Sequence, residues 1–577
     1  MLSAVRFPGT PRRISRPSPL HLPLLLLLVA VGCEPTEGPP PPDEEEARVT
    51  AEESIRPEVA GLHGAVVAGH PLAAQAGYQV LRNGGNATDA AVTMAGILAV
   101  VRPHMNSVGG DAFALFHSPG SPTVEALNGS GRAAAGATPE FYREQELESV
   151  PFSGALSVTV PGAVSAWAAA LERHGTISLA EALEPAIELA RDGFVVTHTL
   201  ERDFASVDRL NEAGQDLYGP GGEQLRAGDI LRNPALAETL ETIAEEGPGA
   251  IYGGSVGEAL ARFLEEEGSP LRIEDFAEHT ADWGESLSIP FQGLQVHTHP
   301  PSSQGMALLQ ILGLTEARGL DHEGPLAVDH LHNMIEATRI ALADRDEHLA
   351  DPEVAEVPVD RLLSAEYLAE RAGEIGSSAM GELGADEVAE GDGDTVYLMA
   401  VDADGNAVSW IQSIFSSFGS QLVEPETGIV LQNRGAGFVL DEGHPNQIAP
   451  GKRPFHTLLP AMVTDGDDEF WAALGTPGGH GQPQTVAQAL IQITTFGMSP
   501  QEAAEAPRFR VDDGYGVLLE QRIPVHVRDA LADRGHEVEV IDGWVATFGN
   551  LQVILRTDEG VLRTGADMRR EAAAAAY

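Results

Sequence analysis

The sequence contains one cysteine, Cys33, and one lysine, Lys452, among its 577 residues. A single cysteine excludes an internal disulfide and a metal site made of several cysteine side chains. Acidic side chains far outnumber basic ones: 86 Asp and Glu against 35 Lys and Arg give a formal net charge of −51. So strong a negative charge opposes binding to nucleic acid and to an acidic membrane surface, and we expect no nucleic acid among the partners. A GC-rich coding bias and adaptation to salt both stay open as causes of the acidity.

The apolar stretch over residues 22–31 is too short to cross a bilayer comfortably. Arg12, Arg13 and Arg16 precede it and Cys33 follows it, a pattern typical of a bacterial lipoprotein signal peptide over residues 1–33. Residues 34–55, rich in proline and acid, predict an extended tether. We therefore expect a periplasmic or outer-membrane lipoprotein of the cell envelope, attached to the membrane by the lipid on Cys33 alone. An ordinary signal peptide with an incidental cysteine, and hence a secreted protein, is the alternative.

The rest of the chain has the composition of a folded protein. Hydrophobic residues make up 43% of the sequence, and 63 Gly and 39 Pro predict many turns. Because 577 residues exceed what one simple core holds, we expect two domains or two interlocked halves. Strand and helix signals alternate to about residue 349, with a strand over 63–69 and helices over 88–100, 179–192 and 328–343.

This alternation breaks at residues 377–394, which are acidic, rich in glycine and poor in large apolar side chains. Such a composition predicts an exposed loop. A β-rich run follows directly, from Thr395 to Val401, then a turn signal over 402–406 and a second strand over 407–414. A loop that leads to a threonine at the start of a buried strand is the arrangement that an N-terminal-nucleophile hydrolase needs.

The chemistry explains why the threonine would have to become a chain end. A threonine hydroxyl is a poor nucleophile at neutral pH and needs a base beside it. If the chain is cut between Asp394 and Thr395, the new α-amino group, with a pKa of about 8, becomes that base on the same residue.

Short motifs in a fixed order surround Thr395, and together they resemble the gamma-glutamyltransferase family over about residues 56–577. The resemblance implies an α+β fold, a four-layer αββα sandwich formed by two subunits cut from one precursor. It also implies a large subunit over 56–394, a small catalytic subunit over 395–577, and no cofactor. The matching motifs are Gly-Gly-Asn-Ala at 84–87, Val-Pro-Gly-Ala at 160–163, Leu-Ala-Arg-Asp-Gly-Phe at 189–194, Pro-Pro-Ser-Ser at 300–303, Ala-Asp-Arg at 343–345, Gly-Lys-Arg-Pro at 451–454 and Pro-Gly-Gly at 477–479.

The resemblance also assigns catalytic positions. Thr395 matches the nucleophile, and cleavage is expected between it and Asp394. Ser413 matches a second hydroxyl that hydrogen-bonds the nucleophile. Gly478 and Gly479 match the pair whose backbone N–H groups form the oxyanion hole, a task for which glycine suits because both amides must point into one cavity.

The expected substrate-binding residues depart from the family's pattern. The arginine that binds the substrate carboxylate is displaced by two residues, to Arg132, and Phe415 stands where members have Asn. Gly437 stands where members have an Asp for the substrate α-amino group, and residues 439–449 are shorter than in members with a lid. We expect the substrate to be bound by these residues: Arg132, Asn433, Arg434, His456 and Thr457.

The resemblance implies a self-processing γ-glutamyl amide hydrolase or transferase that acts on glutathione or related compounds. Its partners would be a small-molecule substrate and the two chains of its own precursor. Three alternatives stay open: an N-acyl amidase similar to cephalosporin acylases, a cell-wall or capsule acyltransferase, and a surface lipoprotein without activity. The missing α-amino contacts favour the amidase, with hydrolysis dominating over transfer.

Overall fold

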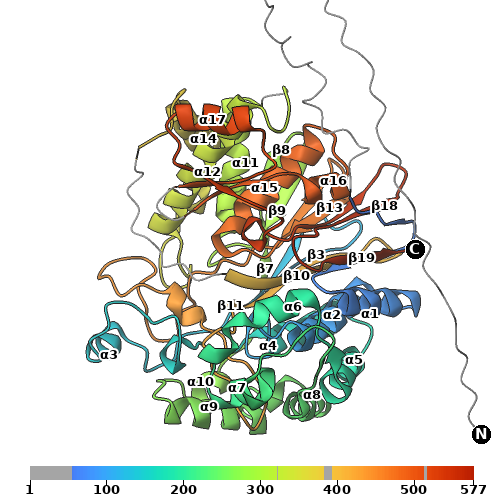
Figure 1. Ribbon diagram of the computed structural model, residues 1–577, viewed down its shortest axis with the longest axis vertical. Helices are drawn as coiled ribbons and strands as arrows, with labels where there is room; N and C mark the ends of the chain where they lie inside the picture. Colours follow the sequence, from blue (N-terminus) through green and yellow to red (C-terminus); the bar gives the residue numbers. More distant parts are fainter. Residues whose placement is uncertain (1–54, 321–322, 382–392, 513–515) are drawn as a thin grey trace, which may run out of the picture. The chain divides into compact units, whose positions relative to one another are not determined.

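The computed structural model describes residues 55–320, 323–381, 393–512 and 516–577 (Figure 1). The expected signal peptide over 1–33, its Cys33, and all of the expected tether but residue 55 lie outside the described residues, as do positions 382–392 of the expected loop. Among the helices of the described part, none is both long and apolar enough to span a membrane.

Two seven-stranded sheets form the centre of the fold, and all their pairings are antiparallel. The first sheet, in spatial order, consists of β19 (Ala573–Ala576), β2 (Ala65–Ala68), β10 (Gly393–Val401), β11 (Ala407–Ser416), β3 (Asp111–His117), β4 (Glu125–Gly129) and β7 (Asp282–Glu285). The second consists of β1 (Ala60–Gly61), β18 (Leu562–Ala566), β17 (Gln552–Arg556), β13 (Phe470–Gly475), β12 (Ala461–Thr464), β9 (Leu294–Thr298) and β8 (Leu287–Phe291). Both sheets therefore combine strands from before and after Thr395.

Side-chain alternation along the strands explains how the sheets stack. On β10, Tyr397, Met399 and Val401 belong to a buried cluster shared with Met462 of β12 and other residues of the second sheet. The intervening residues, Val396 among them, belong to a different cluster, formed with helices. Because side chains along a strand alternate between its two faces, the first sheet packs one face on the second sheet and the other on helices.

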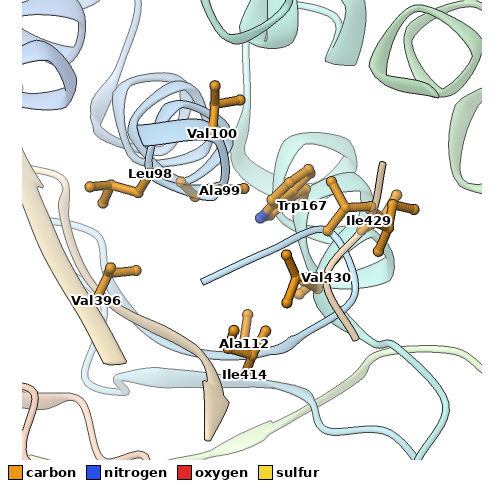
Figure 2. Packing of buried hydrophobic residues seen from close by; sticks show 14 of the residues in the cluster. Leu98, Ala99, Val100, Ala112, Trp167, Val396, Ile414, Ile429 and Val430 are labelled. Atoms are coloured by element: carbon orange, nitrogen blue, oxygen red, sulfur yellow. The ribbon is translucent and has the colours of Figure 1, made fainter. Parts of the chain in front are cut away.

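The helical layer on the first sheet is centred on α2 (Ala87–Val101), all of whose residues are buried (Figure 1). Figure 2 shows Leu98 of α2 on the side of Val396, and Trp167 beside Ile429 and Val430. The indole N–H of Trp167 donates to Gln412 on β11 over 2.9 Å. The other helices of this half are α1 (Pro71–Arg82), α3 (Pro139–Arg143), α4 (Ala163–His174), α5 (Leu179–Asp192), α6 (His198–Asp203), α7 (Glu212–Tyr218), α8 (Pro234–Glu246), α9 (Ser255–Glu266) and α10 (Ile273–Ala277).

The second sheet is covered by α11 (Gly305–Arg318), α12 (Val328–His348) and α15 (Gln482–Thr494), which share a buried apolar cluster with β9, β12, β13 and β17. The four-layer αββα arrangement expected from the resemblance is thus confirmed. The remaining elements are α13 (Val359–Leu362), α14 (Ala365–Glu374), α16 (Pro500–Glu505), α17 (Val525–Asp533), a three-stranded sheet of β14 (Phe509–Val511), β15 (Val517–Glu520) and β16 (Val538–Ile541), and a two-stranded sheet of β5 (Phe194–Val195) and β6 (Ile230–Leu231).

The prediction of an exposed loop over residues 377–394 is wrong for its last two residues. Strand β10 begins at Gly393, so Thr395 is its third residue and Asp394 is buried. Two contacts account for this. The backbone of Asp394 pairs with Phe415 on β11, and its carboxylate forms an ion pair with Arg570 at 2.7 Å.

Candidate active site

Thr395 lies at a register shift between β10 and β11. Asp394 pairs with Phe415, but Val396 pairs with Gln412, so both Ser413 and Ile414 lie opposite Thr395. Such a bulge twists the strands locally and re-aims side chains. Here it occurs at the peptide bond that is expected to be cut.

The side chains of Thr395 and Ser413 form a chain of hydrogen bonds to the expected scissile carbonyl. Thr395 Oγ1 donates to Ser413 Oγ over 3.2 Å, and Ser413 Oγ donates to the carbonyl oxygen of Asp394 over 2.7 Å. The Ser413 oxygen also accepts from the backbone N–H of Phe415 over 2.8 Å and from Arg434 over 3.3 Å. Because donors to a hydroxyl oxygen make its proton more acidic, these contacts strengthen the polarisation of the Asp394 carbonyl.

Gly478 and Gly479 lie on the turn after β13, beside the start of β10. Their φ angles of 128° and 54° are positive, which glycine adopts without strain. A Cβ on Gly393 would lie 2.6 Å from the Cα of Gly479, so the two backbones touch. Gln304 fixes the turn from the other side, since its amide donates to the carbonyl oxygens of Gly479 (2.8 Å) and Thr457 (2.6 Å).

Arg434 is fully buried behind Ser413. Its guanidinium lies 4.2 Å above the ring of Phe415 and donates to the hydroxyl oxygen of Thr457 over 3.1 Å. Its Nε is buried without a hydrogen-bond partner, and within the described residues no carboxylate forms an ion pair with it. Burial lowers the pKa of Arg434 to about 9, against the opposing charge of Asp111.

Asp111 is a buried carboxylate whose charge acts on this arginine. It pairs with Ser413 across β3 and β11, and its oxygens accept from the backbone N–H of Gly131 (2.9 Å) and the amide of Gln432 (3.2 Å). His456 completes the group, with Nε2 at 3.2 Å from Asp111. Burial raises the pKa of Asp111 to about 7 and lowers that of His456 well below its usual value.

Hydrogen bonds connect Thr395, Ser413, Arg434 and Thr457 into one group. His456 joins it through Asp111, which pairs with Ser413 across the sheet. Asn433 lies next to this group, but its side-chain amide is hydrogen-bonded to neighbouring residues. Its oxygen accepts from the backbone N–H of Ser416, and its nitrogen donates to the carbonyl oxygen of Phe152 and to the Ser416 hydroxyl.

Arg132 lies elsewhere in the described structure. It donates to Glu353 over 3.0 Å and to the carbonyl oxygen of Gly451 over 3.1 Å. No hydrogen bond or ion pair recorded for the described residues joins Arg132 to Thr395 or Ser413, so the displaced arginine faces a separate acidic cluster.

An open cleft of about 580 Å³ adjoins the expected cleavage point. Its lining includes charged residues of both signs beside Gly393 and Gly478. These charged residues are Asp203, Arg209, Asp394, Arg510, Asp512 and Arg570.

One group of described residues has the chemistry of a metal site, the buried His332, Glu336 and His536. Glu336 already accepts from Arg339 (3.0 Å) and from the backbone N–H of Met380 (2.9 Å), and His332 and His536 contact each other at 2.8 Å. These contacts satisfy the carboxylate without a cation, and the group makes no recorded contact with Thr395.

Sequence reasoning missed three residues of the site: Asp111, Gln304 and Gln432. The signals that could have found them are local. Asp111 is a lone acid after two glycines in an apolar run, and Gln304 directly follows the Pro-Pro-Ser-Ser motif at 300–303. Arg345 of the Ala-Asp-Arg motif donates to Gln304 over 2.9 Å, so two separate motifs support one turn.

A model of the gamma-glutamyltranspeptidase family matches residues 73–577. The chain is 38% identical over 527 residues to the glutathione hydrolase-like YwrD proenzyme of Bacillus subtilis (strain 168), covering 89% of this chain and 99% of that one. It is 37% identical over 532 residues to the oxamate amidohydrolase proenzyme of Klebsiella pneumoniae, covering 89% of this chain and 98% of that one.

Solved structures agree with the sequence relatives. The structure superposes on cephalosporin acylase from Bacillus halodurans with a TM-score of 0.85 at 37% identity, covering 92% of this chain and 98% of that one. The match therefore spans both sheets, both helical layers and the Thr395 strand. Fold, motif order and family model agree, and the chain is an enzyme that belongs to the gamma-glutamyltranspeptidase family.

Proposed function

We propose that this protein is a self-processing amide hydrolase that cleaves γ-glutamyl amides such as glutathione, with Thr395 as its nucleophile. The observation that carries the proposal is the chain of hydrogen bonds from Thr395 Oγ1 through Ser413 to the Asp394 carbonyl oxygen. This geometry places the attacking hydroxyl beside a polarised carbonyl carbon in the uncut chain.

Processing requires no other reactant than water. The Thr395 hydroxyl adds to the Asp394 carbonyl carbon and its proton passes to the Thr395 nitrogen. The carbon–nitrogen bond then breaks, which frees the α-amino group and leaves Asp394 as an ester on Thr395 Oγ1. Water hydrolyses this ester, restores the hydroxyl and ends the 56–394 chain in a carboxylate.

The processed site would act on substrates in the same way. The free α-amino group of Thr395 takes the hydroxyl proton, and the acyl carbon of the substrate becomes bonded to Oγ1. The N–H groups of Gly478 and Gly479 would stabilise the oxyanion, the amine leaves with a proton, and water releases the acid.

A second candidate is an N-acyl amidase whose acyl group carries no α-amino group. Arg434 favours it, because a buried guanidinium repels an ammonium group, and the neighbouring Phe415 and Gly437 offer no carboxylate to bind one. The cephalosporin acylase and the oxamate amidohydrolase support this candidate by their likeness to the chain.

Mass spectrometry of the purified protein tests the processing. We expect two chains, the smaller beginning at Thr395, and one uncut, inactive chain for Thr395→Ala. A smaller chain that begins at another residue would contradict the assignment of the nucleophile.

Matched chromogenic substrates separate the two candidates. We expect L-γ-glutamyl-4-nitroanilide and glutaryl-4-nitroanilide to be hydrolysed at comparable rates, with little transfer to glycylglycine. A preference of about a hundredfold for the γ-glutamyl donor, or about 2.7 kcal/mol, would exclude the amidase.

We also propose that the protein is held in the cell envelope by a lipid on Cys33. The apolar stretch at 22–31 followed by the only cysteine supports this. The Cys33→Ser variant should leave the membrane fraction with unchanged hydrolysis in detergent-free extracts. If the variant stays with the membrane, an uncleaved apolar segment is the better explanation.

A further inference from the structure

Asp394, the residue before the expected cut, is anchored through its backbone and through its side chain. Its carbonyl oxygen accepts from Ser413 over 2.7 Å, and its backbone pairs with Phe415 on β11. Its carboxylate accepts from Arg570, also over 2.7 Å, and the side chains of this ion pair are only 10% and 14% exposed. The residue that carries the scissile carbonyl is therefore held at both of its ends.

The carboxylate of Asp394 lies on the helical side of the first sheet. Side chains alternate along a strand, and Val396, two positions later on β10, belongs to the buried cluster formed with helices. Arg570 lies on the same side, since its guanidinium contacts the sulfur of Met105, another member of that cluster. By the same alternation the side chain of Thr395 is directed to the opposite face, so Arg570 acts on the peptide bond through residue 394.

Arg570 is itself held in place by neighbouring charges. Its Nη1 lies 3.6 Å from Asp203 at the end of α6, and Asp203 also lies 3.7 Å from the buried Arg102. Glu571, the residue after Arg570, pairs with Arg102 over 2.7 Å. Because Arg102 directly follows α2, the guanidinium that binds Asp394 is fixed relative to two helices. A donor that is already fixed loses less conformational freedom when it holds its partner.

The ionic group around Asp394 contains more carboxylates than arginines. Its members are Arg102, Asp203, Asp394, Arg570 and Glu571, with His104 at 3.2 Å from Asp203 and His70 at 3.9 Å from Glu571. Arg570 bridges Asp203 and Asp394 within this group. Without its positive charge the two carboxylates would repel each other, and the Asp394 side chain would turn into the open cleft that it lines.

We propose that Arg570 is a positioning residue for self-cleavage: by holding the Asp394 carboxylate, it keeps the scissile carbonyl against Ser413. The inference rests on the proposed self-processing and adds to it a residue outside the Thr395–Ser413 pair that sets the rate of the cut. In this role Arg570 transfers no proton. Its effect comes from geometry, because a displacement of about 1 Å between reacting groups is enough to slow a reaction strongly.

Self-cleavage of the precursor made by cell-free synthesis tests the inference, with denaturing gels of a time course as the measurement. We expect Arg570→Gln and Asp394→Asn each to slow the cut about tenfold, the size of one charge-assisted hydrogen bond. The double variant should be no slower than the slower single variant, because the first change already removes the interaction. Arg570→Lys keeps the charge and should restore part of the rate.

A matched arginine outside the group serves as the control. Arg563 also pairs with a carboxylate from the other side of the cut, Glu58, over 2.5 Å, but it does not line the cleft. Arg563→Gln should therefore cut at the wild-type rate. Sodium chloride should slow the wild-type cut and affect Arg570→Gln less, because salt screens a partly exposed ion pair.

Folding of each variant is checked by thermal unfolding of the same change in the uncut Thr395→Ala chain. Should Arg570→Gln not fold, Arg570→Lys and Asp394→Asn carry the test. A wild-type rate in Asp394→Asn or in a folded Arg570→Gln would overturn the inference. A double variant slowed by the product of the two single effects would overturn it as well.

Failure of the proposed function gives a different result. If the wild-type chain stays uncut, or if its smaller chain begins at a residue other than Thr395, the proposed self-processing fails and the role of Arg570 fails with it. If the wild-type chain is cut before Thr395 and the variants are cut equally fast, only the role of Arg570 fails.

Discussion

At the scale of single residues, Ser413 connects Thr395, the proposed nucleophile, to the carbonyl that we expect it to attack. Its hydroxyl accepts from Thr395 and donates to the Asp394 carbonyl oxygen. Ser413→Ala removes both contacts, and we expect self-cleavage to slow by about a hundredfold, as when an oxyanion donor is lost. Denaturing gels of a time course measure the rate. Ser413→Thr keeps the hydroxyl and should restore most of it, whereas wild-type cleavage in Ser413→Ala would contradict this role.

Gly393 matters because it has no side chain, which leaves room for the backbone of Gly479. A Cβ at this position would lie 2.6 Å from the Cα and 2.8 Å from the N of Gly479. We expect Gly393→Ala to displace the Gly478–Gly479 turn and to slow cleavage at least tenfold, since catalysis depends on donors placed within fractions of an ångström. Gly381→Ala is the control, because nothing lies within 4 Å of a Cβ there. Equal cleavage rates in the two variants would show that the turn adapts.

How far the sequence predicts the site depends on the sequence separation of the contacts. Thr395 and Ser413 are 18 positions apart on neighbouring strands, and a motif comparison finds both. Asp111 meets His456 across 345 positions, and Gln304 meets Gly479 across 175. Only the tertiary fold brings these residues together, so no local pattern predicts the contacts.

At the scale of elements, the turn between β10 and β11 depends on one carboxylate. Asp402 accepts from the backbone N–H groups of Asp404 and Asn406 and from the buried N–H of Ala87, which starts α2. We expect Asp402→Ala to destabilise the protein by about 2 kcal/mol, because it leaves a buried donor unpaired. Thermal unfolding measures the loss. Asp404→Ala, at an exposed position of the same turn, should change little, and an equal loss in both variants would argue against the role of Asp402.

Helices could be predicted where apolar residues continue in a helical pattern over the whole segment. The helix over 179–192 and the buried helix near 88–100 match α5 and α2, while α12 continues past the expected residue 343 to His348. The start of β10 was not predictable, because the glycine-rich, acidic composition before Thr395 is typical of a loop. The ion pair of Asp394 with Arg570, a residue far along the chain, orders it instead.

At the scale of the whole molecule, buried histidines set the response to acid. Burial lowers the pKa to about 3 in His70 and His279 and to about 4 in His297, His299 and His536. In the unfolded chain the same rings would take up protons near pH 6.5. Between these values the unfolded chain binds more protons, so stability falls as the pH drops from about 6.5 towards 4.

Thermal midpoints at pH 7.5, 6 and 5 check this expectation. Each neutral histidine contributes a loss of up to about 1.4 kcal/mol per pH unit within its range. Asp111 and Asp346 act in the opposite sense, since burial raises their pKa values, to about 7 in Asp111, but they are two carboxyl groups against these five histidines. A midpoint that does not change from pH 7.5 to 5 would contradict the burial of these rings.

Charge repulsion is a second property of the whole molecule. A net charge of −51 opposes the compact state, and salt screens it. We therefore expect the thermal midpoint to rise as sodium chloride is increased from 0.05 M to about 1 M, where the screening length falls to about 3 Å. Sucrose of equal osmolality is the control. A midpoint that falls with salt would mean that ion pairs outweigh the repulsion.

Because both sheets combine strands from before and after Thr395, the cut has a consequence for refolding. After the proposed cut, β10 of the small chain lies between β2 of the large chain and β11, and the second sheet runs from β1 of the large chain through four strands of the small chain to β9 and β8 of the large one. Neither chain alone can complete a sheet, so folding has to precede the cut and the precursor is the folding unit. The cut enzyme would therefore refold poorly after denaturation. Its two separated chains would have to associate in solution before they could refold, a step that the uncut chain does not require.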